Sequence, residues 1–185
     1  MTICETLSNI YYKDDEEICN DLVPLLRREI LYLKSIGCKE IQIDEPLFAR
    51  QPKKALDWGI DLLDCIIKGI SNVFFTVHIC CGYPNYLDQI NYKKADNSSY
   101  DIIAKSLDDS YIDAISIEDA HCHQDLSFIK KIKKKTIVFG VIAVAKSKVE
   151  SVTEITERIN EVLKFINKER LIIAPDCGLG FLPKP

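Results

Sequence analysis

The chain has 185 residues, of which 47% are hydrophobic and 28% charged, and its formal net charge is −4. These values are ordinary for a globular protein and exclude a disordered, collagen-like or wholly coiled-coil chain. The mild negative charge argues against a nucleic-acid-binding protein, which needs a basic face. No apolar run reaches the roughly 18 residues of a membrane span. Residues 1–20 lack the pattern of a secretory signal, so we expect a cytoplasmic protein with one domain over residues 1–185.

The helical pattern is clearest in four stretches of the chain. Apolar residues recur at helical spacing over residues 14–36, 53–70, 98–107 and from 151 onward. Pro24 lies inside the first stretch and is expected to kink or divide that helix. The last stretch opens with Ser151 followed three residues later by Glu154, which is the capping-box pattern.

Five β-rich runs alternate with these helices, at residues 40–44, 73–77, 114–117, 137–144 and 171–174. Their spacing is typical of consecutive βαβ units, and runs that are apolar on both faces indicate a parallel sheet covered by helices. No glycine-rich phosphate-binding motif follows any of the runs. The pattern therefore favours an α/β fold of the (β/α)8 barrel type, in which the chemistry lies at the carboxyl ends of the strands.

Those strand ends hold the chemically active side chains. The four segments that follow strands are Asp44-Glu45-Pro46, His78-Ile79-Cys80, Glu118-Asp119-Ala120-His121 and Asp176-Cys177-Gly178. Because the carboxyl ends of parallel strands share one rim, we expect these segments to lie together. The chain has eight cysteines, none in a CxxC pair, so any metal site must combine residues that are distant in sequence.

A zinc site is one interpretation of this rim. Zinc takes about four ligands from Cys, His and carboxylate side chains. His78, Cys80, Glu118 and Cys177 supply such a mixed set from three strand ends. The alternative is structural, with the cysteines as small buried apolar residues and the histidine as a satisfied core residue.

Other polar residues of the rim also have two interpretations. Asp44 and Glu45 could clamp a substrate or act as an acid/base pair, or they could form ion pairs with a neighbouring loop. His121 and His123 could act as an acid/base pair or as alternative metal ligands, but their positions favour solvated loop residues.

Four of these motifs together resemble the catalytic domain of cobalamin-independent methionine synthase. The motifs occur in the family's order and are Ile41-Gln42-Ile43-Asp44-Glu45-Pro46, His78-Ile79-Cys80, Ser116-Ile117-Glu118 and Pro175-Asp176-Cys177-Gly178-Leu179. The resemblance implies a (β/α)8 barrel and a zinc ion held by His78, Cys80, Glu118 and Cys177. It also implies methyl transfer from a methyl-folate to homocysteine, with Asp44 holding the amino group of homocysteine.

The sequence departs from that family at three positions. Ala145 stands in place of the proposed proton-donating histidine, Arg50 in place of a folate-contacting glutamate, and Thr6 in place of a tryptophan. Residues 78–84, 118–121 and 143–147 look more like the branch that contains epoxyalkane:coenzyme M transferase, which implies an epoxide donor and coenzyme M as the alternative substrates. Arg50 and Lys146 are then candidate cations for a sulfonate, and His121 and Lys146 are the candidate catalytic residues.

The resemblance also implies that the barrel is incomplete in this chain. A (β/α)8 barrel takes roughly 250 residues, whereas this sequence matches only about the last five β/α units. We therefore expect the N-terminal strands and the last helix to be missing. The chain could be an active part of an enzyme, an inactive zinc-binding fragment, one half of a split enzyme whose partner chain supplies the missing strands, or a complete open-sheet domain.

Overall fold

The computed structural model describes residues 1–82, 84–96 and 98–180. Its centre is one sheet of five parallel strands in the order β1-β2-β3-β4-β5, so each strand pairs with the next along the chain. The strands are β1 (Glu40–Asp44), β2 (Phe74–Ile79), β3 (Ala114–Ile117), β4 (Thr136–Ile142) and β5 (Leu171–Pro175). All five predicted strands are confirmed, with ends shifted by one or two residues.

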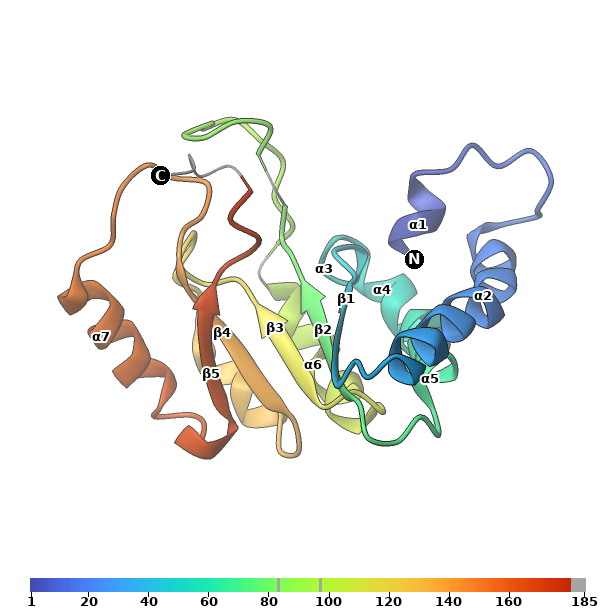
Figure 1. Ribbon diagram of the computed structural model, residues 1–185. Helices are drawn as coiled ribbons and strands as arrows, with labels where there is room; N and C mark the ends of the chain where they lie inside the picture. The colour runs from blue at the N-terminus through green and yellow to red at the C-terminus, as the bar shows by residue number, and fades with distance from the viewer. Residues whose placement is uncertain (83, 97, 181–185) are drawn as a thin grey trace.

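Helical segments connect the strands, as Figure 1 shows. The α-helices are α1 (Thr2–Glu5), α2 (Asp15–Ser35), α3 (Leu47–Arg50), α4 (Pro52–Lys54), α5 (Ile60–Ile67), α6 (Ser98–Asp109) and α7 (Val152–Val162). The other helical turns are a π segment, η1 (Ala55–Gly59), and two 3₁₀ turns, η2 (Leu126–Lys131) and η3 (Lys168–Arg170).

The structure corrects two of the predicted helices. Helix α2 runs through Pro24 without a break. Proline leaves the carbonyl of Asn20 without its helical partner, and because both residues are exposed, water can satisfy that carbonyl. The predicted helix over 53–70 is instead α4, η1 and α5 in succession, and it ends at Ile67, shortly before Gly69 with φ +76°.

The hydrophobic core lies between the sheet and the helices that cover one of its faces. All four residues of β3 are buried, as expected for the middle strand of a covered parallel sheet. The core includes Ile79, Ile103, Ile115, Phe139 and Val162. Helix α6 packs against η2 on this side, and α5 packs against α2. The covering layer therefore holds the sheet rigid beneath the strand ends.

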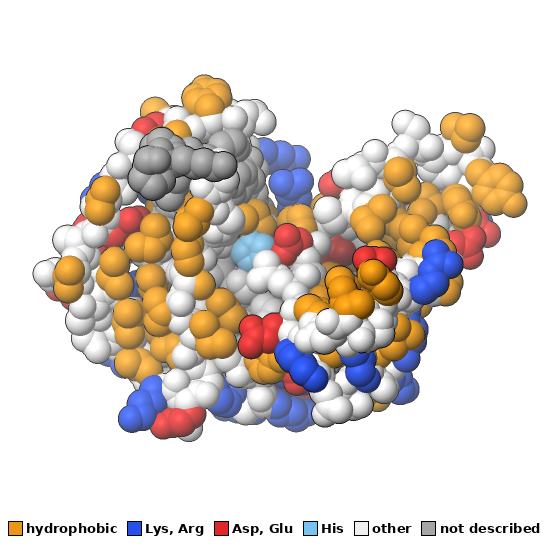
Figure 2. Space-filling view, in the orientation of Figure 1, with side chains coloured by type: hydrophobic (Ala, Val, Ile, Leu, Met, Phe, Trp, Pro, Cys, Tyr) orange, Lys and Arg blue, Asp and Glu red, His pale blue; other side chains and the backbone are white. Residues whose placement is uncertain are grey.

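The outer strands of the sheet carry exposed apolar side chains. In β5, Ile172 is 46% exposed and Ile173 is 40% exposed. Figure 2 shows hydrophobic side chains gathered on the viewed face over β5 and α2. Within the described residues, β1 and β5 are the two edges of the sheet. These apolar edge surfaces are what five consecutive units of a larger barrel would present.

Two further features concern the cysteines and the helices of the described residues. All eight cysteines lie in the described residues, and none forms a disulfide with another. Among the described helices, none combines the length and apolar character needed to cross a membrane.

The capping box at the start of α7 is confirmed and can be tested. Ser151 accepts a hydrogen bond from the backbone N–H of Glu154, and the Glu154 side chain accepts one from the backbone N–H of Ser151. Ser151→Ala removes the side-chain half of this exchange. We expect it to lower the free energy of unfolding by about 1 kcal/mol in chemical denaturation. Thr153→Ala, an exposed change in the same turn, is the control and should cost clearly less.

Candidate metal centre

The carboxyl ends of the strands meet on one rim, at the top of the view in Figure 1. The register places Asp44 of β1 beside His78 of β2, and His78 beside Ser116 of β3. Cys80 follows β2 directly, Glu118 follows β3, and Cys177 follows β5. The prediction that these strand ends share a rim is confirmed.

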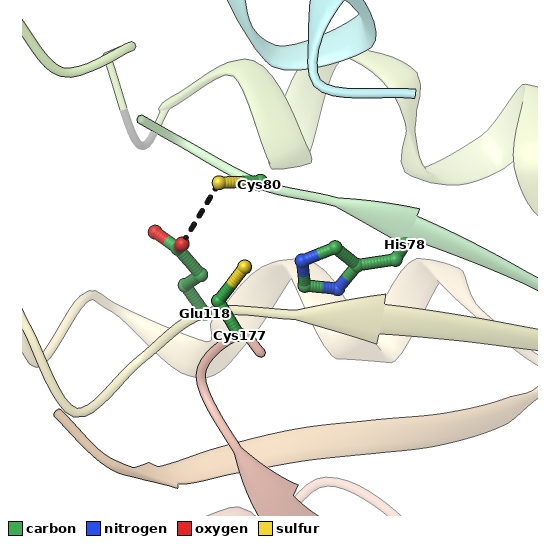
Figure 3. Close-up of side chains that lie close together, drawn as sticks. All are labelled: His78, Cys80, Glu118 and Cys177. Carbon is green, nitrogen blue, oxygen red and sulfur yellow. Dashed lines mark hydrogen bonds between the residues drawn. The ribbon is translucent and has the colours of Figure 1, made fainter. Parts of the chain in front are cut away.

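Four side chains converge at this rim, as Figure 3 shows. One possible ligand atom from each of His78, Cys80, Glu118 and Cys177 lies within 4.8 Å of all the others. In a flat sheet, the ends of β2 and β5 would be three strand spacings apart, or roughly 14 Å. The sheet therefore curves, as the wall of a barrel does, and this curvature brings Cys177 to the ligands on β2 and β3.

Hydrogen bonds orient two of the four side chains. Cys80 Sγ donates to Glu118 Oε1 at 3.1 Å. His78 Nδ1 forms a 2.8 Å hydrogen bond with Ser116 Oγ, which leaves Nε2 as the free ring nitrogen. That Nε2 is buried and has no hydrogen-bond partner among the described residues. A metal ion would satisfy it, so two thiols, a carboxylate and an orphaned imidazole nitrogen fit zinc.

The electrostatics of the cluster favour one thiolate. Hydrogen bonding with Cys80 lowers the pKa of Cys177 well below its usual range; burial opposes this effect, and His78 reinforces it. The pKa of Cys80 is raised in turn, first by Cys177 and then by burial. Burial also raises the pKa of Glu118, although Lys94 works against it. A cation at the centre would stabilise the charged forms of all three groups.

A buried carboxylate ties two of the strand ends together. Asp176 is 0% exposed and accepts backbone N–H groups from Asp119, Ala120 and His121, each at 2.9 Å. It also forms a short hydrogen bond with Nδ1 of His121. The segment that follows Glu118 is thereby held against the segment that begins Cys177. Asp176 was visible in the sequence only as a neighbour of Cys177, and its role follows from contacts over more than 50 residues.

A cavity of about 520 Å³ lies next to the cluster. It is lined by His121, Lys146, Ala145 and Lys94, among others. Lys94 Nζ lies 3.6 Å from Glu118 Oε2, so this lysine adjoins the cluster. Sequence reasoning missed Lys94 because it lies in an irregular segment between β2 and α6, where no periodicity predicts its position. The two candidate catalytic residues, His121 and Lys146, do come together here.

Two of the three predicted substrate-binding residues, Asp44 and Glu45, lie at the end of β1 and have different surroundings. Asp44 is exposed at the end of β1, accepts a 2.8 Å hydrogen bond from Gln42 and acts electrostatically on His78. Glu45 is buried and accepts hydrogen bonds from the nitrogens of Met1 and Thr2, both at 2.8 Å.

The remaining predicted residues lie outside the cluster. Arg50 ends α3, is 44% exposed in its side chain and lies 4.0 Å from Glu5, so it is not brought to the four ligands or to the cavity beside them. His123 is exposed, has φ +44° and is not one of the clustered ligands.

The protein has a parallel α/β sheet, and a group of side chains that could hold a metal ion lies on the carboxyl rim of that sheet. This combination is typical of barrel-type α/β enzymes. The comparisons give the family. Residues 5–184 match the family described as "Cobalamin-independent synthase, Catalytic domain", and the chain therefore belongs to it.

Individual relatives agree with this assignment. The chain is 33% identical over 184 residues to a methionine synthase of Thermococcus kodakarensis and 34% identical over 185 residues to one of Sulfolobus acidocaldarius, in each case over 99% of this chain and 49% of the relative. A B12-independent methionine synthase from Shewanella sp. W3-18-1, solved with selenomethionine, superposes with a TM-score of 0.87 at 29% identity.

The same comparisons define the extent of the match. The Shewanella structure is matched over 99% of this chain and 54% of that chain. The chain therefore spans about half the length of the relatives it matches. The relatives named here are methionine synthases, and they lend no support to the epoxyalkane:coenzyme M transferase branch.

The contact between Asp176 and β4 provides a test of how the centre is held. A Cβ atom on Gly140 would lie 2.8 Å from Cα of Asp176, and nearer still to its carboxylate. Gly140→Ala should therefore push the Cys177 segment away, lower the free energy of unfolding by about 1–3 kcal/mol and reduce metal retention.

Gly180→Ala is the matched control, because no atom of the described residues, apart from its chain neighbours, lies within 4 Å of the added Cβ. Both variants are compared by chemical denaturation and by metal analysis after gel filtration. If Gly140→Ala retained the stability and metal content of the control, the close approach of Asp176 would not be what positions Cys177.

Proposed function

We propose that the chain carries the zinc centre of a cobalamin-independent methionine synthase and takes part in methyl transfer from a methyl-folate to homocysteine. The observation that carries this proposal is the convergence of two thiols, a carboxylate and an unpartnered imidazole nitrogen within 4.8 Å. Membership of the synthase family supports the reaction class. Because the chain covers about half of its relatives, the activity is proposed for the complete barrel.

The residues of the rim have separate roles in this proposal. His78, Cys80, Glu118 and Cys177 are the proposed zinc ligands, and Ser116 fixes the ring of His78 through Nδ1. When bound, zinc would supply the Lewis acidity that holds the acceptor sulfur as the nucleophilic thiolate. Asp44, exposed beside His78, is placed to pair with the ammonium group of homocysteine.

The choice of acceptor rests on three observations. Asp44 attracts an ammonium group, which homocysteine has and coenzyme M lacks. The Shewanella relative was solved with selenomethionine, an analogue of a methylated homocysteine. Arg50, which would favour a sulfonate if it lay at the site, faces Glu5 instead. Lys146, the other cation proposed for a sulfonate, lines the cavity beside the cluster, so the position of Arg50 weakens the coenzyme M alternative in one of its two cations.

The metal centre is tested by elemental analysis of the purified chain. We expect about one zinc per chain, because the four side chains would supply the ligands of a single site. Cys177→Ser should lower the occupancy sharply, since a hydroxyl is a poor zinc ligand. Cys65→Ser is the control: Cys65 is exposed on α5, away from the rim. Equal occupancy in the two variants would contradict the assignment.

The activity is tested with homocysteine and a methyl-folate carrying a glutamate tail, with methionine measured by mass spectrometry. Cys80→Ala should abolish methionine formation, because it removes a proposed ligand in contact with Glu118. Cys38→Ala, at the turn before β1, is the control and should retain it. The chain is assayed alone and together with the N-terminal half of the Thermococcus kodakarensis relative. Methionine formation that survives Cys80→Ala would contradict the proposed site.

A further inference from the structure

The two carboxylate oxygens of Glu118 have different partners. Oε1 accepts a hydrogen bond from Cys80 Sγ at 3.1 Å, so it faces the other proposed ligands (Figure 3). Oε2 accepts the backbone N–H of Cys81 at 3.2 Å and lies 3.6 Å from Lys94 Nζ. The side chain of Glu118 is only 1% exposed, so protein groups rather than bulk solvent set its orientation. The carboxylate is therefore held through one oxygen and presents the other to the cluster.

Lys94 places a buried positive charge beside Oε2. Its Nζ atom is buried, makes no hydrogen bond to any described residue and lies 5.4 Å from the centre of the Tyr92 ring. Among the described residues, Glu118 is the acidic group with which Lys94 forms an ion pair. A buried charge is costly unless an opposite charge lies near it, and the attraction is stronger away from water. Lys94 therefore acts on the outer oxygen of Glu118 in particular.

The backbone is arranged so that the segment of Lys94 can approach the end of β2. Ala95 donates its backbone N–H to Cys81 O at 2.6 Å. A Cβ atom on Gly82 would lie 2.7 Å from Lys93 O and 3.4 Å from Lys94 Cα, and Gly82 has φ +142°, which favours glycine. Glycine at this position thus leaves the space that the segment occupies. The position of Lys94 is therefore fixed by the main chain on both sides of it.

We propose that Lys94 is a positioning residue of the metal centre, which holds Oε2 of Glu118 so that Oε1 is directed at the metal ion. The inference rests on the proposed function and adds a residue beyond the four proposed ligands. Lys94 is not itself a ligand, because a protonated lysine has no lone pair to offer. Ser116 has the corresponding role for His78, whose Nδ1 it holds. Groups that hold a metal ligand from outside fix its orientation, and their loss weakens metal binding.

The test is metal binding by the full chain, without substrate and without catalysis. The affinity for Zn²⁺ is measured by competition with a chromophoric chelator, and the surroundings of bound Co²⁺ are followed by its visible absorption. Lys94→Met removes the charge and keeps a side chain of similar length. Lys93→Met makes the same change at the neighbouring residue, which is exposed, and is the matched control. Lys94→Arg keeps a cation at the position.

We expect Lys94→Met to weaken Zn²⁺ binding by about tenfold or more, the loss typical of a group that holds a metal ligand. The absorption of bound Co²⁺ should also change, because it depends on the number and arrangement of the ligand atoms. Lys93→Met should behave as wild type in both measurements. Lys94→Arg should recover part of the affinity, since a cation is again available to Oε2.

A double-mutant cycle shows whether Lys94 acts through Glu118. Glu118→Gln keeps the shape of the side chain and removes the charge with which Lys94 pairs. If Lys94 acts by holding Oε2, adding Lys94→Met to Glu118→Gln should change the Zn²⁺ affinity by less than about twofold, which is the scatter of such cycles. If the loss caused by Lys94→Met is instead as large in the Glu118→Gln chain as in wild type, Lys94 does not act through Glu118 and the inference is overturned.

The outcomes separate this inference from the proposed function. If wild type and Lys94→Met bind Zn²⁺ equally well, the positioning role is overturned and the metal centre stands. If metal binding depends on Lys94 but the chain forms no methionine together with the N-terminal half of the Thermococcus kodakarensis relative, the positioning role is supported and the proposed function is contradicted. A wild-type chain that binds neither Zn²⁺ nor Co²⁺ overturns both. Thermal melting of the metal-free variants shows whether each one folds, and Lys94→Gln, with the same expected loss, replaces Lys94→Met if that variant unfolds.

Discussion

The rim depends on the buried carboxylate of Asp176. It accepts three consecutive backbone N–H groups after β3 and bonds to the ring of His121, while the next residue along the chain is Cys177. One side chain thus sets the distance between the Glu118 and Cys177 segments and orients the imidazole that faces the cavity. A carboxylate in this position is fully satisfied although it is buried. Gly140 leaves the space on β4 that this approach requires.

A second interaction supports the rim from below. Tyr100 of α6 is buried, donates its hydroxyl to Ile79 O at 2.7 Å and accepts the backbone N–H of Glu118 at 3.2 Å. It therefore joins the helical layer to the two strand ends that carry Cys80 and Glu118. The proposed metal-binding side chains therefore lie above a packed layer of helices. The irregular segments beside them carry Lys94 and Lys146. Such a division between a rigid base and variable upper loops is the usual arrangement in barrel enzymes.

Acidic and basic side chains lie on different sides of the cluster. Asp44 stands on the β1 side, and Lys94, His121 and Lys146 stand on the side of the cavity. The proposed zinc ligands lie between the two.

The sequence by itself determined the features that depend on neighbouring residues or on strand topology. Alternating apolar runs predicted the five strands, and Ser151 with Glu154 predicted the start of α7. The shared rim of a parallel sheet predicted that His78, Cys80, Glu118 and Cys177 meet, and the family resemblance implied that they hold zinc. Only the tertiary structure decided that Pro24 does not divide α2, that Arg50 faces Glu5, and that Lys94 and Asp176 belong to the site. The physical reason is that periodicity and capping are local, whereas the curvature of the sheet and the hydrogen bonds of a buried carboxylate join residues that are far apart in the chain.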